Sequence, residues 1–97
     1  MIIKKHMAEG RRLILAACDD ELLGKRFEEN GKQLDVSPEF YNGEKIAEAE
    51  LVRLIGKAYI INAVGKKSVA CCAKADICSK EDILKIEGIP YLQAVLF

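Results

Sequence analysis

The sequence predicts an α+β protein, a two-layer α/β sandwich in which a hairpin-rich, mostly antiparallel sheet carries two main helices on one face. Three features support this class. Segments with strand character outnumber helical ones, glycine-containing turns join strands into hairpins, and two segments have the apolar spacing of amphipathic helices. The chain has 97 residues, 51% of them hydrophobic, which suits a single domain over residues 1–97.

A first hairpin is predicted at the N-terminus, from strands at residues 1–7 and 11–18. Gly10 lies in the turn between them, where it can adopt a positive φ. Residues 13–18 are all apolar, so we expect the second strand to lie inside the sheet with both faces covered.

A helical turn and a second hairpin follow. Asp19 is expected to cap a single helical turn that Gly24 ends with a positive φ. The Asn30-Gly31 pair predicts the two-residue turn of a hairpin over 25–36. Its core-facing side chains are expected to be Phe27, Leu34 and Val36.

The C-terminal half carries both main helices. Leu51, Leu54, Ile55 and Ala58 are spaced as the buried stripe of a helix beginning near residue 48. Residues 59–63 predict an interior strand, which leads into a second helix. The remaining predictions are a buried helix face made by Val69, Cys72 and Ala73, and closing strands at 83–86 and 91–97.

Composition excludes several classes of protein. Fifteen basic and fifteen acidic side chains give a formal net charge of zero, so the overall basicity of most dedicated nucleic-acid binders is missing. The longest apolar runs, 13–18 and 58–61, are far shorter than the roughly 18 residues of a membrane-spanning helix. No signal peptide is recognisable, and we expect a cytoplasmic protein without a membrane partner.

The four cysteines favour neither disulfides nor a metal site. Cys71 and Cys72 are adjacent, Cys78 follows at a distance and Cys18 is remote, a spacing that matches no usual zinc pattern. Free cysteine behaves as a small hydrophobic residue. We therefore expect free thiols, no metal and no cofactor.

The segment Gly65, Lys66, Lys67 and Ser68 is a candidate anion-binding site. A strand that leads through glycine into a helix exposes free backbone N–H groups and the positive end of the helix dipole. A nucleotide-binding P-loop is excluded, because Ile60 stands where that motif needs glycine. Two interpretations stay open: a purely structural helix start, or a site for phosphate or carboxylate.

Charge is segregated along the chain despite the neutral total. Residues 1–26 hold six basic and four acidic side chains, residues 27–50 hold two and seven, and residues 51–97 hold seven and four. The N-terminal hairpin would form a basic patch if it shared a face with the candidate anion site. Otherwise these charges form a solvated surface. The patch consists of Lys4, Lys5, Arg11 and Arg12, with His6 among them.

No catalytic residues are predicted. His6 is the one histidine, and nothing in the sequence places it beside a cysteine or serine that it could activate. Three consecutive acids, from Asp19 to Glu21, could suggest a magnesium site, but capping by Asp19 and the preference of acids for the first turn of a helix explain them better.

Four short segments, in order, resemble one known family. They are residues 18–25 (Cys-Asp-Asp-Glu-Leu-Leu-Gly-Lys), 40–43 (Phe-Tyr-Asn-Gly), 62–69 (Asn-Ala-Val-Gly, then Ser-Val) and 89–93 (Ile-Pro-Tyr-Leu-Gln). Together they resemble the archaeal family catalogued as domain of unknown function 424. The resemblance implies a cytosolic two-layer α/β protein with no established activity, cofactor or catalytic residues.

One departure from the family pattern bears on function. In the family the Ile-Pro pair continues with His-Ala-Gln, whereas this chain has Tyr91, Leu92 and Gln93. If that histidine served chemistry, this chain lacks it, which favours binding over catalysis.

The leading hypothesis is a non-enzymatic module that binds an anionic partner, RNA or a ribonucleoprotein, through the basic hairpin and the start of the second helix. A small enzyme or phosphometabolite-binding protein that uses residues 65–68 is the alternative. A third class is a protein-interaction subunit, such as a homodimer formed through an exposed edge strand.

Overall fold

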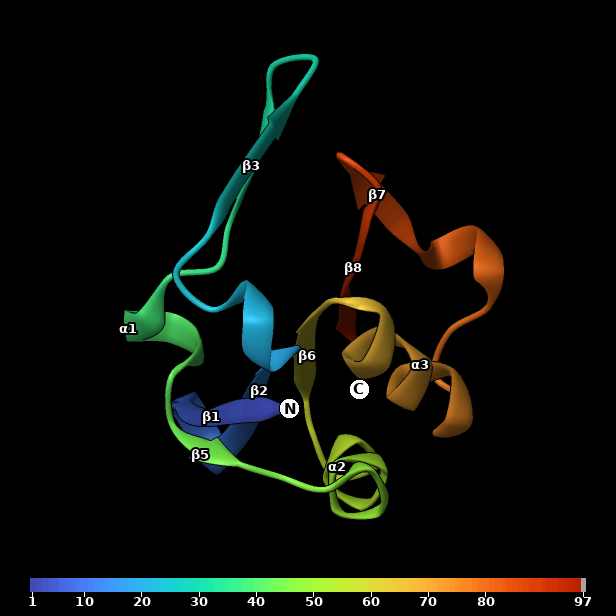
Figure 1. Ribbon diagram of the computed structural model, residues 1–97. Coiled ribbons are helices and arrows are strands. Elements are labelled where there is room, and N and C mark those ends of the chain that lie inside the picture. Colours follow the sequence, from blue (N-terminus) through green and yellow to red (C-terminus); the bar gives the residue numbers. More distant parts are fainter. Residues whose placement is uncertain (97) are drawn as a thin grey trace.

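The computed structural model describes residues 1–96, and Figure 1 shows the course of the chain. The strands are β1 (Ile2–Ala8), β2 (Arg12–Cys18), β3 (Arg26–Glu29), β4 (Lys32–Asp35), β5 (Glu44–Lys45), β6 (Ile60–Val64), β7 (Leu84–Ile86) and β8 (Ile89–Val95). The α-helices are α1 (Pro38–Tyr41), α2 (Glu48–Ile55) and α3 (Lys66–Lys74). Three 3-10 turns lie at Glu9–Arg11, Asp20–Leu22 and Lys80–Asp82.

Six strands form one sheet in the order β5-β1-β2-β6-β8-β7, and β3 pairs with β4 in a separate hairpin. Neighbouring strands in the main sheet are antiparallel except for β2 and β6, which are parallel. The mostly antiparallel, hairpin-rich sheet is therefore confirmed, as are the interior positions of β2 and β6. The parallel pair was not predicted, because its connection runs through the β3–β4 hairpin, α1, β5 and α2.

Helices α2 and α3 pack on one face of the main sheet, as expected (Figure 1). Their shared core contains the predicted stripe of α2, with Leu51, Ile55 and Ala58 fully buried. In α3 the buried face differs from the prediction, because Ala73 is exposed and Ser68 and Cys71 are buried instead. Val69 and Cys72 are buried as predicted, and Ser68 is buried because it bonds to Asp19, a contact described below.

The opposite face is covered by α1, the 3-10 turn at Asp20–Leu22 and the β3–β4 hairpin. Phe27 pairs with Leu34 across the hairpin. The buried side chains on this face form what we call the second core cluster, which contains Leu34 and Val36 and against which Phe27 packs, as predicted. In Figure 1 the far end of this hairpin extends beyond the main sheet, opposite β7.

Two turns behave as the sequence indicates. Gly24 ends the helical turn with φ +84°, and Gly31 closes the second hairpin with φ +80°. Both values lie in the left-handed region that glycine adopts at little cost. Asp19, however, makes no side-chain hydrogen bond to the helical turn that it was expected to cap, so that prediction was wrong.

None of the helices in residues 1–96 is long and apolar enough to cross a membrane.

Candidate functional site

The start of α3 is occupied by a side chain of the protein itself. Because β2 and β6 are parallel neighbours, the residues that follow them, Asp19 and Gly65, lie at the same edge of the sheet. Asp19 is 3% exposed, and its Oδ2 accepts a hydrogen bond of 3.0 Å from the backbone N–H of Lys67. Its Oδ1 accepts from the backbone N–H and the hydroxyl of Ser68, each at 2.8 Å. Asp19 therefore caps α3 across the fold.

Gly65 is glycine because of this contact. Its φ is +107°, and a Cβ at this position would collide with the Asp19 carboxylate. Its backbone N–H donates to the carbonyl of Pro90 at 2.8 Å. The dipole and the N–H groups that were expected to bind an external anion thus already face a buried carboxylate.

The expectation of an open anion site at Gly65, Lys66, Lys67 and Ser68 is corrected accordingly. Gly65 and Ser68 are buried, and Ser68 already donates to Asp19. Lys66 and Lys67 remain exposed beside a pocket of about 270 Å³, where Glu21 and Asp19 also contribute negative charge. The Asp19 carboxylate already occupies the position at the helix start that an external anion would need. An anion in the pocket would therefore be repelled by Asp19 and Glu21.

The expected basic patch is divided between two faces. Side chains alternate along a strand, so Lys4 and His6 lie on the face that α1 covers. Lys4 Nζ donates to the carbonyl of Glu39 at 2.8 Å, and His6 Nε2 lies 2.9 Å from the carbonyl oxygen of Phe40. Lys5 points the other way, with its Nζ 3.9 Å from a carboxylate oxygen of Glu44.

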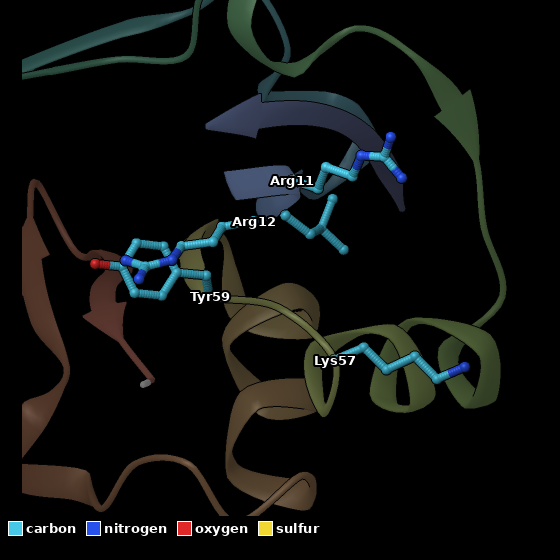
Figure 2. A pocket seen from close by; sticks show the side chains of 5 residues that line it. Arg11, Arg12, Lys57 and Tyr59 are labelled. Carbon is cyan, nitrogen blue, oxygen red and sulfur yellow. The ribbon is translucent and has the colours of Figure 1, made fainter. Parts of the chain in front are cut away.

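Arg11 and Arg12 belong to a different feature, which we call the basic pocket. It has a volume of about 320 Å³ and is lined by Arg11, Arg12, Leu13, Lys57 and Tyr59. The guanidinium carbon of Arg12 lies 4.5 Å from the centre of the Tyr59 ring, a cation–π contact. Figure 2 shows Arg12 across this ring, with Arg11 and Lys57 extending away from it.

The backbone around the basic pocket is well anchored. Tyr59 donates its backbone N–H to the carbonyl of Leu13 at 2.8 Å, and its carbonyl accepts from Leu96 at 2.7 Å. Lys57 lies in the turn that closes α2, where its N–H donates to Leu54 at 2.9 Å. Arg11 adopts φ +60°, a left-handed conformation that is costly for a residue with a Cβ.

Positive charge dominates this end of the sheet. Within residues 1–96, Arg11, Arg12 and Lys57 form no ion pair. The nearby carboxylate of Glu50 is bonded to Arg53, and that bond, with smaller effects of Lys5 and Lys57, holds the pKa of Glu50 below its usual value. The pocket is thus lined by three cations that have no ion-pair partner within residues 1–96, and one of them, Arg12, covers the ring of Tyr59.

The basic pocket and the start of α3 lie at opposite ends of β6. Tyr59 precedes this strand and Gly65 follows it, so the two features are about 20 Å apart at about 3.3 Å per residue. Lys66 and Lys67 therefore do not share a surface with Arg11 and Arg12. The combined patch that the charge pattern suggested does not form.

Lys57 and Tyr59 were not among the predicted site residues. No signal in the sequence identifies them, because only the parallel pairing of β2 and β6 places Tyr59 beside Leu13. In the described part of the chain, no three His, Cys, Asp or Glu side chains cluster as metal ligands, and all four cysteines are free thiols.

Comparison with known proteins places the chain in a family. A family model described as a protein of unknown function, DUF424, matches residues 6–97, and no curated protein matches the chain. The chain is also similar to the crystal structure of an uncharacterized conserved protein from Methanopyrus kandleri. The identity is 25%, the TM-score is 0.83, and the match covers 98% of this chain and 90% of the other. The chain belongs to the DUF424 family, as its ordered short segments indicated.

Proposed function

We propose that the protein is a non-enzymatic RNA-binding module and that the basic pocket is its binding site. The observation that carries the proposal is that Arg11, Arg12 and Lys57, none of them ion-paired within residues 1–96, line one pocket with Tyr59, whose ring Arg12 covers. Cations attract the phosphate backbone, and an aromatic ring gives bases a surface for stacking.

RNA fits this site better than a small phosphometabolite does. The cations lie on exposed side chains that extend in different directions from the pocket (Figure 2), which suits several phosphates along a chain. A site for a small phosphometabolite usually has several backbone N–H groups that point at one phosphate. Such N–H groups occur in this protein at the start of α3, where they already donate to Asp19. Local charge also explains how a neutral protein can bind a polyanion.

The test compares two charge-reversed variants that differ only in location. Arg11→Glu with Lys57→Glu alters the basic pocket, and Lys66→Glu with Lys67→Glu makes the same change in net charge at the far end of β6. Binding of a fluorescein-labelled single-stranded RNA is measured by anisotropy over a salt series, with thermal melting as the folding control.

We expect the first variant to bind at least about tenfold more weakly at low salt and the second to bind nearly as the parent does. In a plot of the logarithm of the binding constant against the logarithm of the salt concentration, the slope of the first variant should also be shallower. The expected decrease is roughly 0.7 for each phosphate that the variant no longer neutralises. A greater weakening in the second variant would overturn the proposal. So would a parent that binds polyglutamate of matched charge as tightly as RNA, since the site would then recognise acidic protein.

A further inference from the structure

The ring of Tyr59 is the aromatic surface of the basic pocket. The chain has three tyrosines and no tryptophan. Tyr41 is 7% exposed. Tyr59 and Tyr91 are both half-buried, but Tyr91 packs against the second core cluster, whereas Tyr59 lines the basic pocket. Its backbone is held at both the N–H and the carbonyl, so the ring projects from a fixed position.

We propose that Tyr59 stacks against an unpaired nucleobase, so that the protein binds single-stranded rather than double-stranded RNA. This inference rests on the RNA-binding function proposed above. In the free protein the planar guanidinium of Arg12 covers the ring at 4.5 Å, the position in which a base would stack. The guanidinium and the base are both flat groups that pack face to face on an aromatic ring.

The energetics favour exchange of the guanidinium for a base. Stacking of a base on an aromatic side chain is generally stronger than an exposed cation–π contact. Arg12 is exposed and lies on a flexible stem, so it can leave the ring and contact a phosphate next to the bound base. The cation then stays within the site as the base enters.

The size of the pocket argues against a duplex. A volume of about 320 Å³ is at the small end of pockets that hold one compact ligand. An RNA duplex keeps its bases stacked inside the helix, out of reach of a single side chain in a pocket. An unpaired base can be turned outward onto Tyr59, while Arg11 and Lys57 contact the flanking phosphates.

The experiment compares three probes with the same number of phosphates: a single-stranded oligouridylate, an abasic oligonucleotide and an RNA duplex. We expect the parent to bind the oligouridylate roughly 5- to 140-fold more tightly than the abasic chain, which is the range that stacking of one base produces. Tyr59→Ala should remove this preference, and Tyr59→Phe should keep it because the ring remains.

Tyrosine fluorescence gives a second readout that needs no destabilising change. Stacking of a base on Tyr59 should quench emission from the parent and from the matched control Tyr91→Phe, and Tyr59→Phe should lose the quenching. Equal binding of all three probes, with no quenching, would overturn base stacking while leaving RNA binding through phosphates intact. No binding of any probe at low salt would overturn the proposed function and this inference together.

Discussion

Arg11 combines a costly backbone conformation with an exposed side chain in the basic pocket. Its φ of +60° follows Gly10 at +74°, so two successive residues of the β1–β2 turn are left-handed. Glycine would adopt this conformation with less strain, because the left-handed conformation costs a residue with a Cβ roughly 1–2 kcal/mol of conformational energy. Strain of this kind often marks positions where the side chain serves function.

We therefore expect Arg11→Gly to increase the stability of the fold while weakening RNA binding. The free energy of unfolding in urea should rise by about 0.5–1 kcal/mol, because relief of strain exceeds the entropy cost of glycine. RNA affinity should fall, because the pocket then has one unpaired cation fewer. Arg12→Gly is the matched control: Arg12 has φ −81°, so glycine there should lower stability. Destabilisation by Arg11→Gly would show that the guanidinium supports the fold.

Asp19 illustrates how one side chain can hold two elements together. It accepts three hydrogen bonds from the first turn of α3 while its own backbone N–H donates to Val64 at 3.0 Å. Removing a buried acceptor leaves its donors without partners, which costs more than the loss of an exposed hydrogen bond.

Asp19→Ala should lower the free energy of unfolding by about 2–3 kcal/mol, since it removes a helix cap and leaves buried donors unpaired. Asp20→Ala is the neighbouring control. Asp20 forms exposed ion pairs, so its loss should change stability little. Sulfate should restabilise Asp19→Ala more than the parent in thermal melts, because the vacated helix start can accept an anion. Equal sulfate effects would show that the site does not open.

At the scale of elements, two hydrogen bonds connect the β3–β4 hairpin to the β7–β8 turn, and each element donates one of them. The backbone N–H of Glu28 donates to Oε2 of Glu87 at 2.8 Å, and the N–H of Glu87 donates to Oε1 of Glu29 at 3.0 Å. Figure 1 shows these two elements facing each other. Both bonds are exposed, so this attachment is weaker than the packing of Phe27 and Leu34 against the core.

Glu87→Ala should loosen the hairpin without unfolding the sheet. We expect amide hydrogen exchange of Glu28 to accelerate roughly tenfold by NMR, while amides of β6 stay protected. Glu87→Gln keeps an acceptor oxygen and should show an intermediate rate. Unchanged exchange in Glu87→Ala would show that apolar packing alone holds the hairpin.

At the scale of the whole molecule, buried thiol and phenol groups predict that the folded protein loses stability at alkaline pH. Burial, assisted by the carboxylate of Asp19, raises the pKa of Cys18 from 9.0 to about 11. Burial likewise raises the pKa of Cys72 from 9.0 to about 12 and that of Tyr41 from 10.0 to about 12. Each group stays protonated in the folded protein at pH values where it ionises in the unfolded chain.

The stability that these groups contribute is therefore fully present below pH 9 and is lost as the pH rises through 9 to 12. Between these values the folded state binds more protons, so the free energy of unfolding falls, by up to about 1.4 kcal/mol per pH unit for each thiol. Urea unfolding at about pH 8, 9 and 10 measures the slope. Cys72→Ala should show a shallower fall, and a flat profile in the parent would contradict the buried thiols.

Much of the local structure was predictable from the sequence. The Asn30-Gly31 turn, the pairing of Phe27 with Leu34 and the stripe of α2 depend on residues close together in the chain. The short elements α1 and β5 were not predicted, because Pro38–Tyr41 and Glu44–Lys45 carry no apolar periodicity of their own. Their conformation depends on packing against β1, which Lys4 and His6 reinforce.

Local patterns were enough for the fold class, the order of the main elements and the two glycine turns, because periodicity and backbone preference act over a few residues. The site, in contrast, depends on how distant segments meet. Parallel pairing of β2 with β6 brings Asp19 to Gly65 at one end and Tyr59 to Leu13 at the other. These contacts join segments that are more than 40 positions apart, and no local pattern encodes which distant strand becomes the neighbour.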